Sequence, residues 1–257
     1  MVSAHEYGAR YGRTGARASE LFSDALLMSA DFVEFDVRRT ADGVFVISHD
    51  RTVELAGGRQ DVAHLTLDQL HAAGADVFTY AEALGAIRGK ARAHLDLKFA
   101  PPESSYDGPD NQTWEVQATS QALAALGADN MVVTTGRDLG VAAVRRWAAT
   151  DHPALLVGLS LGGSKAHLPW RERFAARWSE LFPAHRVKIS DPNVVVANKW
   201  LALFGVARWT HRRGLLLLVW TVDDHRGLRR WLGDPRCWMV TTNRVREAVR
   251  IRDGYLD

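Results

Sequence analysis

The chain has 257 residues, of which 47% are hydrophobic and 24% are charged, and its formal net charge is +2. This composition is typical of a globular protein with enough apolar residue for a core, and it excludes a disordered or fibrous chain. The small net charge, without a dense run of Lys and Arg, argues against a nucleic-acid partner.

One cysteine, Cys237, excludes an internal disulfide and suits a reducing compartment. The longest apolar run, Leu215 to Trp220, is far too short to span a bilayer. The chain opens on an apolar strand-like segment, with no basic stretch and apolar run ahead of it. We therefore expect a soluble, cytoplasmic protein without a membrane span, and the sequence leaves its oligomeric state open.

The first predicted strand, Met1 to His5, ends in a histidine, and an amphipathic helix is predicted over Ser19–Met28. In the next strand, residues 33–37, apolar side chains alternate with Glu34 and Asp36. Two carboxylates two residues apart therefore point the same way from a stiff element. That arrangement suits a hard divalent cation, which prefers converging oxygen ligands.

A hairpin is predicted to follow, because Ala41-Asp42-Gly43 has the composition of a tight turn and a second apolar run leads from it to His49-Asp50. Arg51 to Asp61, with its two glycines, is predicted to be loop. Short helices are predicted over residues 66–73 and 79–87.

Ala91 to Lys98 predicts a third strand, with His94, Asp96 and Lys98 on one face. The stretch that follows, Phe99 to Asn111, is the longest irregular segment. A loop of that length in a compact domain is more often functional than accidental.

From residue 113 onward, predicted helices and strands alternate regularly. The helices cover residues 113–126, 139–149, 171–182, 194–212, 223–232 and 244–250, and the strands cover residues 131–134, 154–159, 186–189, 215–219 and 238–241. With the three earlier strands this makes eight βα units without linker-like composition between them. We expect an α/β fold in which residues 1–257 form one domain, a (β/α)₈ TIM barrel. An open doubly wound sheet is disfavoured, because no glycine fingerprint follows the first strand.

Active sites of this fold lie at the C-terminal ends of the strands. Chemically capable residues gather at those predicted ends and in the hairpin: His5, Glu34, Asp36, Arg38, His49, Asp96, Lys98, Trp220 and Thr221. Strands whose polar face is merely exposed to solvent would not collect these residues at their C-terminal ends.

In this order and spacing the residues resemble the glycerophosphodiester phosphodiesterase family. That family belongs to the barrel phosphodiesterases, together with phosphatidylinositol-specific phospholipases C and sphingomyelinase D-type phospholipases D. The motifs that carry the resemblance are His5, Glu34-Phe-Asp36, Thr40-Ala-Asp42-Gly43, His49-Asp50, Asp96-Leu-Lys98 and Trp220-Thr221-Val222.

The resemblance implies a metal-dependent phosphodiesterase that hydrolyses a glycerophosphodiester-like substrate, a small molecule or a lipid head group, to an alcohol and a phosphomonoester. It implies that Glu34, Asp36 and Asp96 bind one Mg²⁺ or Ca²⁺. His5 and His49 would act as acid and base, in an order that stays open.

The resemblance also implies substrate contacts. Lys98 would place its charge against the phosphate, and Trp220 would form a wall of the pocket. His94 faces inward in the same pattern but matches no motif, so we interpret it as structural.

The main departure from the family pattern is Glu6, which stands where the family has an arginine. Three explanations stay open. Glu6 turns away and Arg10, Arg13 or Arg38 supplies the missing charge; or Glu6 binds a cationic or hydroxylated part of a different substrate; or the protein is a non-catalytic binder of phosphorylated ligands.

Other departures are a third acid one methylene shorter, Asp96, and Gly15-Ala-Arg-Ala18 and Thr242-Asn-Arg-Val245 in place of family motifs. The shorter acid resembles the sphingomyelinase D-type branch. A phospholipase D-like or lyase reaction that gives a cyclic phosphate therefore remains an alternative.

Overall fold

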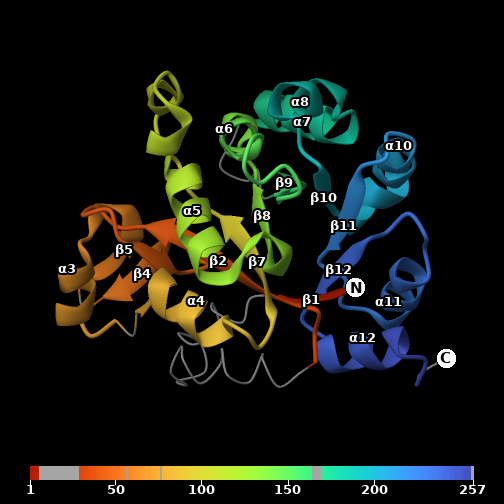
Figure 1. The fold of residues 1–257 in the computed structure, drawn as a ribbon, viewed down its shortest axis with the longest axis horizontal. Coiled ribbons are helices and arrows are strands. Elements are labelled where there is room, and N and C mark those ends of the chain that lie inside the picture. Colours follow the sequence, from red (N-terminus) through yellow and green to blue (C-terminus); the bar gives the residue numbers. More distant parts are fainter. Residues whose placement is uncertain (6–28, 56, 76, 164–168, 256–257) are drawn as a thin grey trace.

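The computed structural model describes residues 1–5, 29–55, 57–75, 77–163 and 169–255. Eight parallel strands close into a barrel in the order β1, β2, β7, β8, β9, β10, β11 and β12, and β12 pairs with β1 to complete the ring. Helices surround the barrel (Figure 1). The predicted α/β (β/α)₈ TIM barrel is therefore confirmed.

The barrel strands are short and nearly all buried. They are β1 Val2–Ala4, β2 Phe32–Arg39, β7 Arg92–Leu97, β8 Met131–Thr135, β9 Leu156–Leu161, β10 Val194–Asn198, β11 Leu216–Trp220 and β12 Met239–Thr242. The helices around them are α3 Leu67–Ala72, α4 Tyr80–Ile87, α5 Trp114–Leu126, α6 Asp138–Ala148, α7 Trp170–Leu181, α8 Ala184–Ser190, α9 Lys199–Leu201, η5 Ala202–Val206, α10 Ala207–His211, α11 His225–Leu232 and α12 Val245–Arg252.

Two hydrophobic cores result, because each parallel strand is covered on both faces. A small cluster fills the barrel interior: Phe32, Val132, Val194, Val196, Leu218 and Met239. The larger cluster packs the outward strand residues, such as Phe35, Leu95 and Val133, against the helices. Polar inward residues of β2 and β7 continue the interior as far as the C-terminal end of the barrel.

A hairpin extends from β2 and brings His49 back beside the barrel end. β3, Phe45–Ile47, pairs antiparallel with β2, and β6, Phe78–Thr79, pairs with β3. In the turn, the Thr40 hydroxyl donates to Asp42 Oδ1 at 2.6 Å and accepts from the Val44 amide at 2.9 Å. Gly43 has a φ of +89°, which favours glycine. The Thr-x-Asp-Gly sequence thus builds the predicted turn.

The prediction of a loop from Arg51 to Asp61 was wrong over most of its length. β4, Thr52–Leu55, and β5, Gly58–Asp61, form an antiparallel pair. Glycines between short segments are a hairpin signal as well as a loop signal, and here the hairpin forms.

The prediction of the sixth barrel strand was also wrong in position. Residues 186–189 lie in helix α8, and Val194–Asn198, predicted to begin a helix, form strand β10. A run of three valines followed by alanine suits a parallel strand that is buried on both faces. Helical structure begins only at Lys199. The number of barrel strands was unaffected.

The predicted helix Ser19–Met28 lies outside the described residues, and so do Glu6, Arg10 and Arg13. Among the helices that the structure describes, none has the length and apolar character needed to cross a bilayer.

Close packing of the barrel interior gives a stability prediction at Gly158. A Cβ at this position would lie 3.0 Å from side-chain carbons of both Thr134 and Val196. We expect Gly158→Val to lower the free energy of unfolding by about 1–3 kcal/mol, because the interior is overpacked. Urea unfolding measures this change.

The matched control is Gly85→Ala on α4, where an added Cβ meets nothing within 4 Å. An alanine in an exposed helix position should raise the free energy of unfolding by up to about 1 kcal/mol. A Gly158→Val variant as stable as the wild type would contradict the packing described for the interior.

Candidate active site

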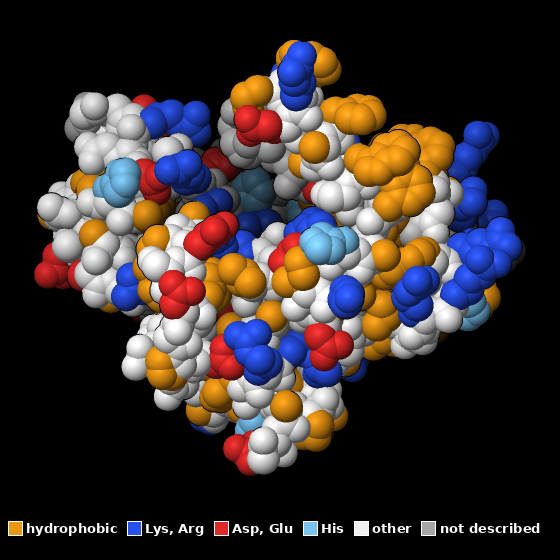
Figure 2. Space-filling model, turned by 90° about the horizontal axis from the view of Figure 1, so that it is seen from above, with side chains coloured by type: hydrophobic (Ala, Val, Ile, Leu, Met, Phe, Trp, Pro, Cys, Tyr) orange, Lys and Arg blue, Asp and Glu red, His pale blue; other side chains and the backbone are white. Residues whose placement is uncertain are grey.

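A cavity of about 530 Å³ opens at the C-terminal ends of the barrel strands. It is visible as the hollow near the centre of Figure 2. Its walls include the predicted site residues and several others: His5, Glu34, Asp36, Arg38, His49, His94, Asp96, Lys98, Thr134, Thr135, Arg137, Ser160, Trp220, Thr221 and Thr241. The structure therefore brings together every predicted site residue that it describes.

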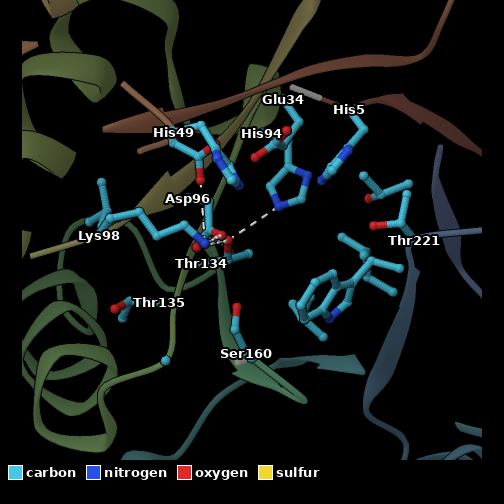
Figure 3. Close-up of a pocket in the computed structure, with 18 of the residues that line it drawn as sticks. His5, Glu34, His49, His94, Asp96, Lys98, Thr134, Thr135, Ser160 and Thr221 are labelled. Carbon is cyan, nitrogen blue, oxygen red and sulfur yellow. Dashed lines mark hydrogen bonds and ion pairs between the residues drawn. The ribbon is translucent and has the colours of Figure 1, made fainter. Parts of the chain in front are cut away.

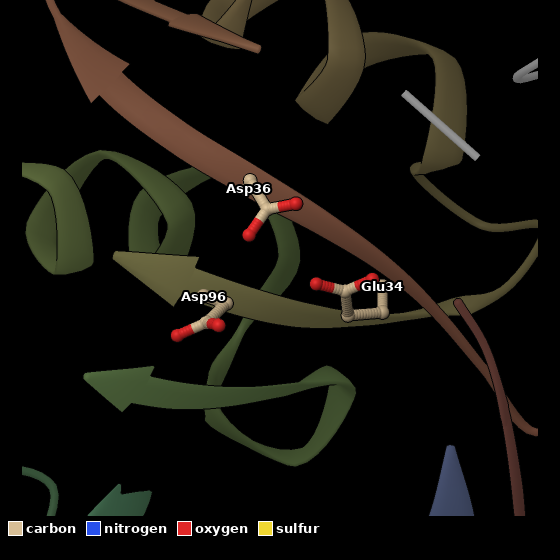
Figure 4. Close-up of side chains that lie close together, drawn as sticks. All are labelled: Glu34, Asp36 and Asp96. Atoms are coloured by element: carbon tan, nitrogen blue, oxygen red, sulfur yellow. The ribbon is translucent and has the colours of Figure 1, made fainter. Parts of the chain in front are cut away.

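Three carboxylates converge inside this cavity. Glu34 and Asp36 point inward from β2, and parallel pairing places Asp36 opposite Asp96 of β7. One oxygen of each acid lies within 4.8 Å of an oxygen of the other two (Figure 4). Glu34 and Asp36 are each only 3% exposed. Hard oxygen donors at this spacing fit a divalent cation such as Mg²⁺ or Ca²⁺.

Lys98 is the cation that faces the acids. Its Nζ lies 3.3 Å from Asp36 Oδ1 and donates a hydrogen bond to Asp96 Oδ2. Burial raises the pKa of Asp36 above its ordinary value despite Lys98. Burial also acts on the pKa of Asp96, but the charge and hydrogen bond of Lys98 outweigh it and lower that pKa. The positive charge of one ammonium does not balance three carboxylates, so a divalent cation could neutralise the remaining negative charge.

His94 lies opposite Glu34 in the register of β2 and β7 and is 3% exposed. Its Nδ1 lies 3.1 Å from the Ser3 hydroxyl. Its Nε2 lies 3.2 Å from the Thr134 hydroxyl (Figure 3). Burial lowers the pKa of His94 to about 4. The ring is therefore neutral near pH 7, so that no positive charge competes with a cation at the carboxylates. This agrees with its interpretation as a structural residue.

His5, which follows β1, is held by the side-chain amide of Asn243, which follows the neighbouring strand β12. Its Nδ1 lies 3.2 Å from Asn243 Oδ1, and Asn243 Nδ2 donates to Asp223 Oδ2 at 2.8 Å. Because the Asp223 carboxylate only accepts, Asn243 must turn its carbonyl oxygen toward His5. In a singly protonated ring this contact places the proton on Nδ1, and the ring lines the cavity.

His49 is oriented by the acid that follows it in the sequence. Its Nδ1 lies 3.0 Å from Asp50 Oδ1, so this ring turns Nε2 toward the cavity. Figure 3 shows His5 and His49 projecting into the pocket on either side of His94. The Asp50 carboxylate therefore contacts the imidazole of the residue before it.

Arg38 ties the loop of His49 to the end of β7. Its guanidinium donates to the carbonyl oxygens of Ser48 at 3.1 Å, His49 at 2.8 Å and Lys98 at 3.3 Å. These bonds position the loop. A direct contact between Arg38 and substrate stays a prediction.

The wall opposite the acids carries the aromatic residue expected there and hydroxyls that the motifs did not indicate. Trp220 lines the cavity, and its Nε1 donates to the Leu161 carbonyl at 3.2 Å. The hydroxyls of Ser160 and Thr241 are buried there without a hydrogen-bond partner among the described residues. Their strands alternate inward and outward, and that pattern was the only signal in the sequence. Arg137, in the loop after β8, also reaches the cavity.

Comparison with known proteins agrees with this geometry. Residues 19–136 match the model of the glycerophosphoryl diester phosphodiesterase family. This match confirms the resemblance predicted from the sequence motifs and the expected class of enzyme, a phosphoric diester hydrolase. A search of curated proteins by sequence finds no match.

Solved structures extend the likeness of fold to nearly the whole chain. A protein of Silicibacter pomeroyi superposes with a TM-score of 0.74 at 17% identity, over 99% of this chain and 93% of that one. A glycerophosphodiester phosphodiesterase from Parabacteroides distasonis gives 0.72 at 18% identity, over 100% and 98%. An Oleispira antarctica phosphodiesterase in complex with the product sn-glycerol-3-phosphate gives 0.67 at 15% identity, over 98% and 96%.

The buried state of His94 predicts a pH dependence of stability. Unfolded histidine titrates near about 6.5, whereas the folded pKa is about 4. Between these values the unfolded state binds more protons, so the free energy of unfolding should fall as the pH is lowered from about 6.5 to about 4. The contribution of His94 to this fall is on the order of 3 kcal/mol.

Urea unfolding at several pH values, on the wild type and on His94→Gln, tests this prediction. The variant should lose that part of the pH dependence. Substitution of the exposed His71 by Gln is the matched control. A His94→Gln variant with the full dependence of the wild type would show that His94 is not the group responsible.

Proposed function

From the premise that this chain is a phosphoric diester hydrolase of the glycerophosphodiester phosphodiesterase type, we propose that it hydrolyses a glycerophosphodiester in a metal-dependent reaction. The products are an alcohol and a phosphomonoester. The observation that carries the proposal is the convergence of three carboxylates, two imidazoles and one ammonium on a single cavity at the end of the barrel. One domain holds the entire site.

In this proposal Glu34, Asp36 and Asp96 hold one Mg²⁺ or Ca²⁺. The bound cation supplies Lewis-acid polarisation of the phosphoryl group and neutralises developing negative charge. The fit rests on the donor set: three carboxylates within 4.8 Å of one another, two of them almost fully buried. Lys98, which already faces Asp36 and Asp96, contributes a further positive charge toward a bound phosphate.

The surroundings of the two histidines suggest different roles. His49 has a carboxylate partner, Asp50, which orients the ring as in other His–Asp pairs. His5 has a neutral amide partner, Asn243, and its ring lines the cavity. We assign His5 as the general base that activates the nucleophile, and His49 as the general acid that protonates the leaving alkoxide.

The rest of the cavity supplies substrate contacts. The unpartnered hydroxyls of Ser160 and Thr241 can hydrogen-bond the glycerol moiety, and Trp220 can pack against its carbons. A glycerol phosphate group is the natural occupant by comparison with the Oleispira phosphodiesterase, whose structure holds sn-glycerol-3-phosphate.

An assay of the wild type on a panel of glycerophosphodiesters, with EDTA and with added Mg²⁺ or Ca²⁺, tests the proposal. We expect turnover that EDTA abolishes and added metal restores, with glycerol phosphate as the phosphorus NMR product. A cyclic phosphate product would show that a substrate hydroxyl, and not water, attacks the phosphorus. Absence of turnover on every diester, with or without metal, would refute the enzymatic proposal.

Metal binding also gives a prediction that is independent of activity. Mg²⁺ or Ca²⁺ at about 100 times its dissociation constant should raise the free energy of unfolding by about 2.7 kcal/mol. Asp36→Asn should remove this stabilisation, because it removes one of the three charged ligands. Thermal or urea unfolding with and without metal measures it.

The control for that experiment is Asp191→Asn, which removes an acid whose side chain is 85% exposed. It should keep the full stabilisation by metal. Equal stabilisation of Asp36→Asn and Asp191→Asn would place the cation away from the three carboxylates.

The two histidines and their partners give a graded prediction. His5→Ala and His49→Ala should each lower kcat by about 10²–10⁴, because each loses a proton-transfer group. Asn243→Ala and Asp50→Ala should cost less, since the imidazole remains and loses only its orientation.

The pH–rate profile distinguishes this arrangement from a structural one. Asn243→Ala should alter the limb that reports the base, and Asp50→Ala the limb that reports the acid. Variants of His5 and His49 that keep wild-type turnover would exclude acid–base catalysis by these rings.

A further inference from the structure

A cluster of aromatic side chains is exposed beside the cavity. Among the described residues, ten large hydrophobic side chains are exposed, and eight of them lie between residues 170 and 204. Six are aromatic and each is more than half exposed: Trp170, Phe174, Trp178, Phe182, Trp200 and Phe204. We call these six residues the aromatic face. An exposed apolar group of this size marks a surface that binds something.

On helix α7 the exposed aromatic residues follow a regular helical spacing. Trp170, Phe174 and Trp178 recur every four residues and form one stripe, and Phe182 continues it just after the helix. Trp178 lies between Phe174, at a ring distance of 6.1 Å, and Phe182, at 4.6 Å. This apolar stripe faces away from the barrel, whereas the buried residue of α7 is Glu180. An ordinary barrel helix has the opposite arrangement.

The aromatic face adjoins the mouth of the cavity. Its two parts follow β9 and β10 in the chain, and those strands contribute Ser160 and Val196 to the cavity. Trp200 lies in α9, which begins directly after β10. Figure 2 shows hydrophobic side chains gathered on the same face as the hollow, with Lys and Arg side chains beside them.

The segment that carries the aromatic face is strongly basic. Residues 170–214 contain nine Lys and Arg against three Asp and Glu, a net charge of +6 in a chain whose total is +2. Exposed basic side chains lie in the same segment, as with Arg171 and Arg173 on α7 and Arg208, Arg212 and Arg213 on and after α10. The guanidinium of Arg171 lies 5.3 Å from the Trp170 ring.

We propose that the aromatic face docks on an anionic lipid surface. Tryptophan and phenylalanine enter the boundary between head groups and acyl chains, and Lys and Arg at the rim attract anionic head groups. A helix with an apolar stripe and basic flanks is the form that lies in the plane of such a surface. A second copy of this chain fits less well, because a two-fold contact would bring the same net +6 segment against itself.

Docking in this orientation would turn the mouth of the cavity toward the lipid. A phosphodiester that carries an acyl chain could then enter the cavity while its chain stays near the surface. This consequence for the substrate rests on the proposed function, whereas the docking itself does not.

Partitioning to vesicles tests the docking directly. Vesicles of phosphatidylcholine with phosphatidylglycerol are sedimented with the wild type and with the double variant Trp178→Ala/Phe204→Ala. We expect the wild type to bind, and the double variant to bind on the order of tenfold or more weakly, because two inserted rings are lost. Binding should weaken on pure phosphatidylcholine, at high salt and in Arg212→Glu/Arg213→Glu.

Tyr255→Ala is the matched control, because this aromatic residue is 75% exposed but lies at the C-terminal end of the described chain. It should bind as the wild type does. Failure of the wild type to bind, or equal binding by the double variant, would overturn the proposal. So would a concentration-dependent dimer that the double variant abolishes, since the occupant would then be a second copy.

Hydrolysis of a soluble glycerophosphodiester separates this proposal from the proposed function. The double variant should keep that activity, because both substitutions lie on the surface outside the cavity. Vesicle binding without any hydrolysis by the wild type would refute the proposed function and leave the docking surface. Hydrolysis by a wild type that does not bind vesicles would refute the docking surface and leave the proposed function.

Discussion

Three inward carboxylates that share one ammonium constrain both the barrel and its cavity. Glu34, Asp36 and Asp96 lie in the barrel interior, where unpaired negative charge is costly. Lys98 relieves part of that cost, and a divalent cation would relieve more. The acids meet only because β2 and β7 pair in parallel with Asp36 opposite Asp96. The strand pairing that closes the barrel therefore also brings the carboxylates together.

Hydrogen bonds from neighbouring residues explain how the imidazoles are held at this charged centre. His5 depends on Asn243, which Asp223 orients from across the seam where β12 meets β1. His49 stands on a loop that Arg38 fastens by three carbonyl oxygens. Neither ring is part of a regular element by itself. His5 is held by a residue at the other end of the chain, whereas His49 is held by its neighbour Asp50 and by the loop that Arg38 fastens.

The sequence indicated the barrel and the motif residues because period-two alternation and strand-end position are local signals. It misplaced the sixth strand, since the Val194–Ala197 run lies next to a helix and has no polar alternation of its own. The hydroxyls of Ser160 and Thr241 carry no motif and enter the cavity only through tertiary closure. The tie between Asn243 and His5 joins residues at opposite ends of the chain, and no local pattern could reveal it.

Anomalous diffraction from crystals grown with Mn²⁺ tests the central claim most directly, because this ion takes the same oxygen ligands as Mg²⁺ and can be located by its scattering. We predict one strong peak among the carboxylate oxygens of Glu34, Asp36 and Asp96, within reach of the cavity. A peak held by other residues, or none at saturating Mn²⁺, would contradict the assignment of these three acids as the metal site.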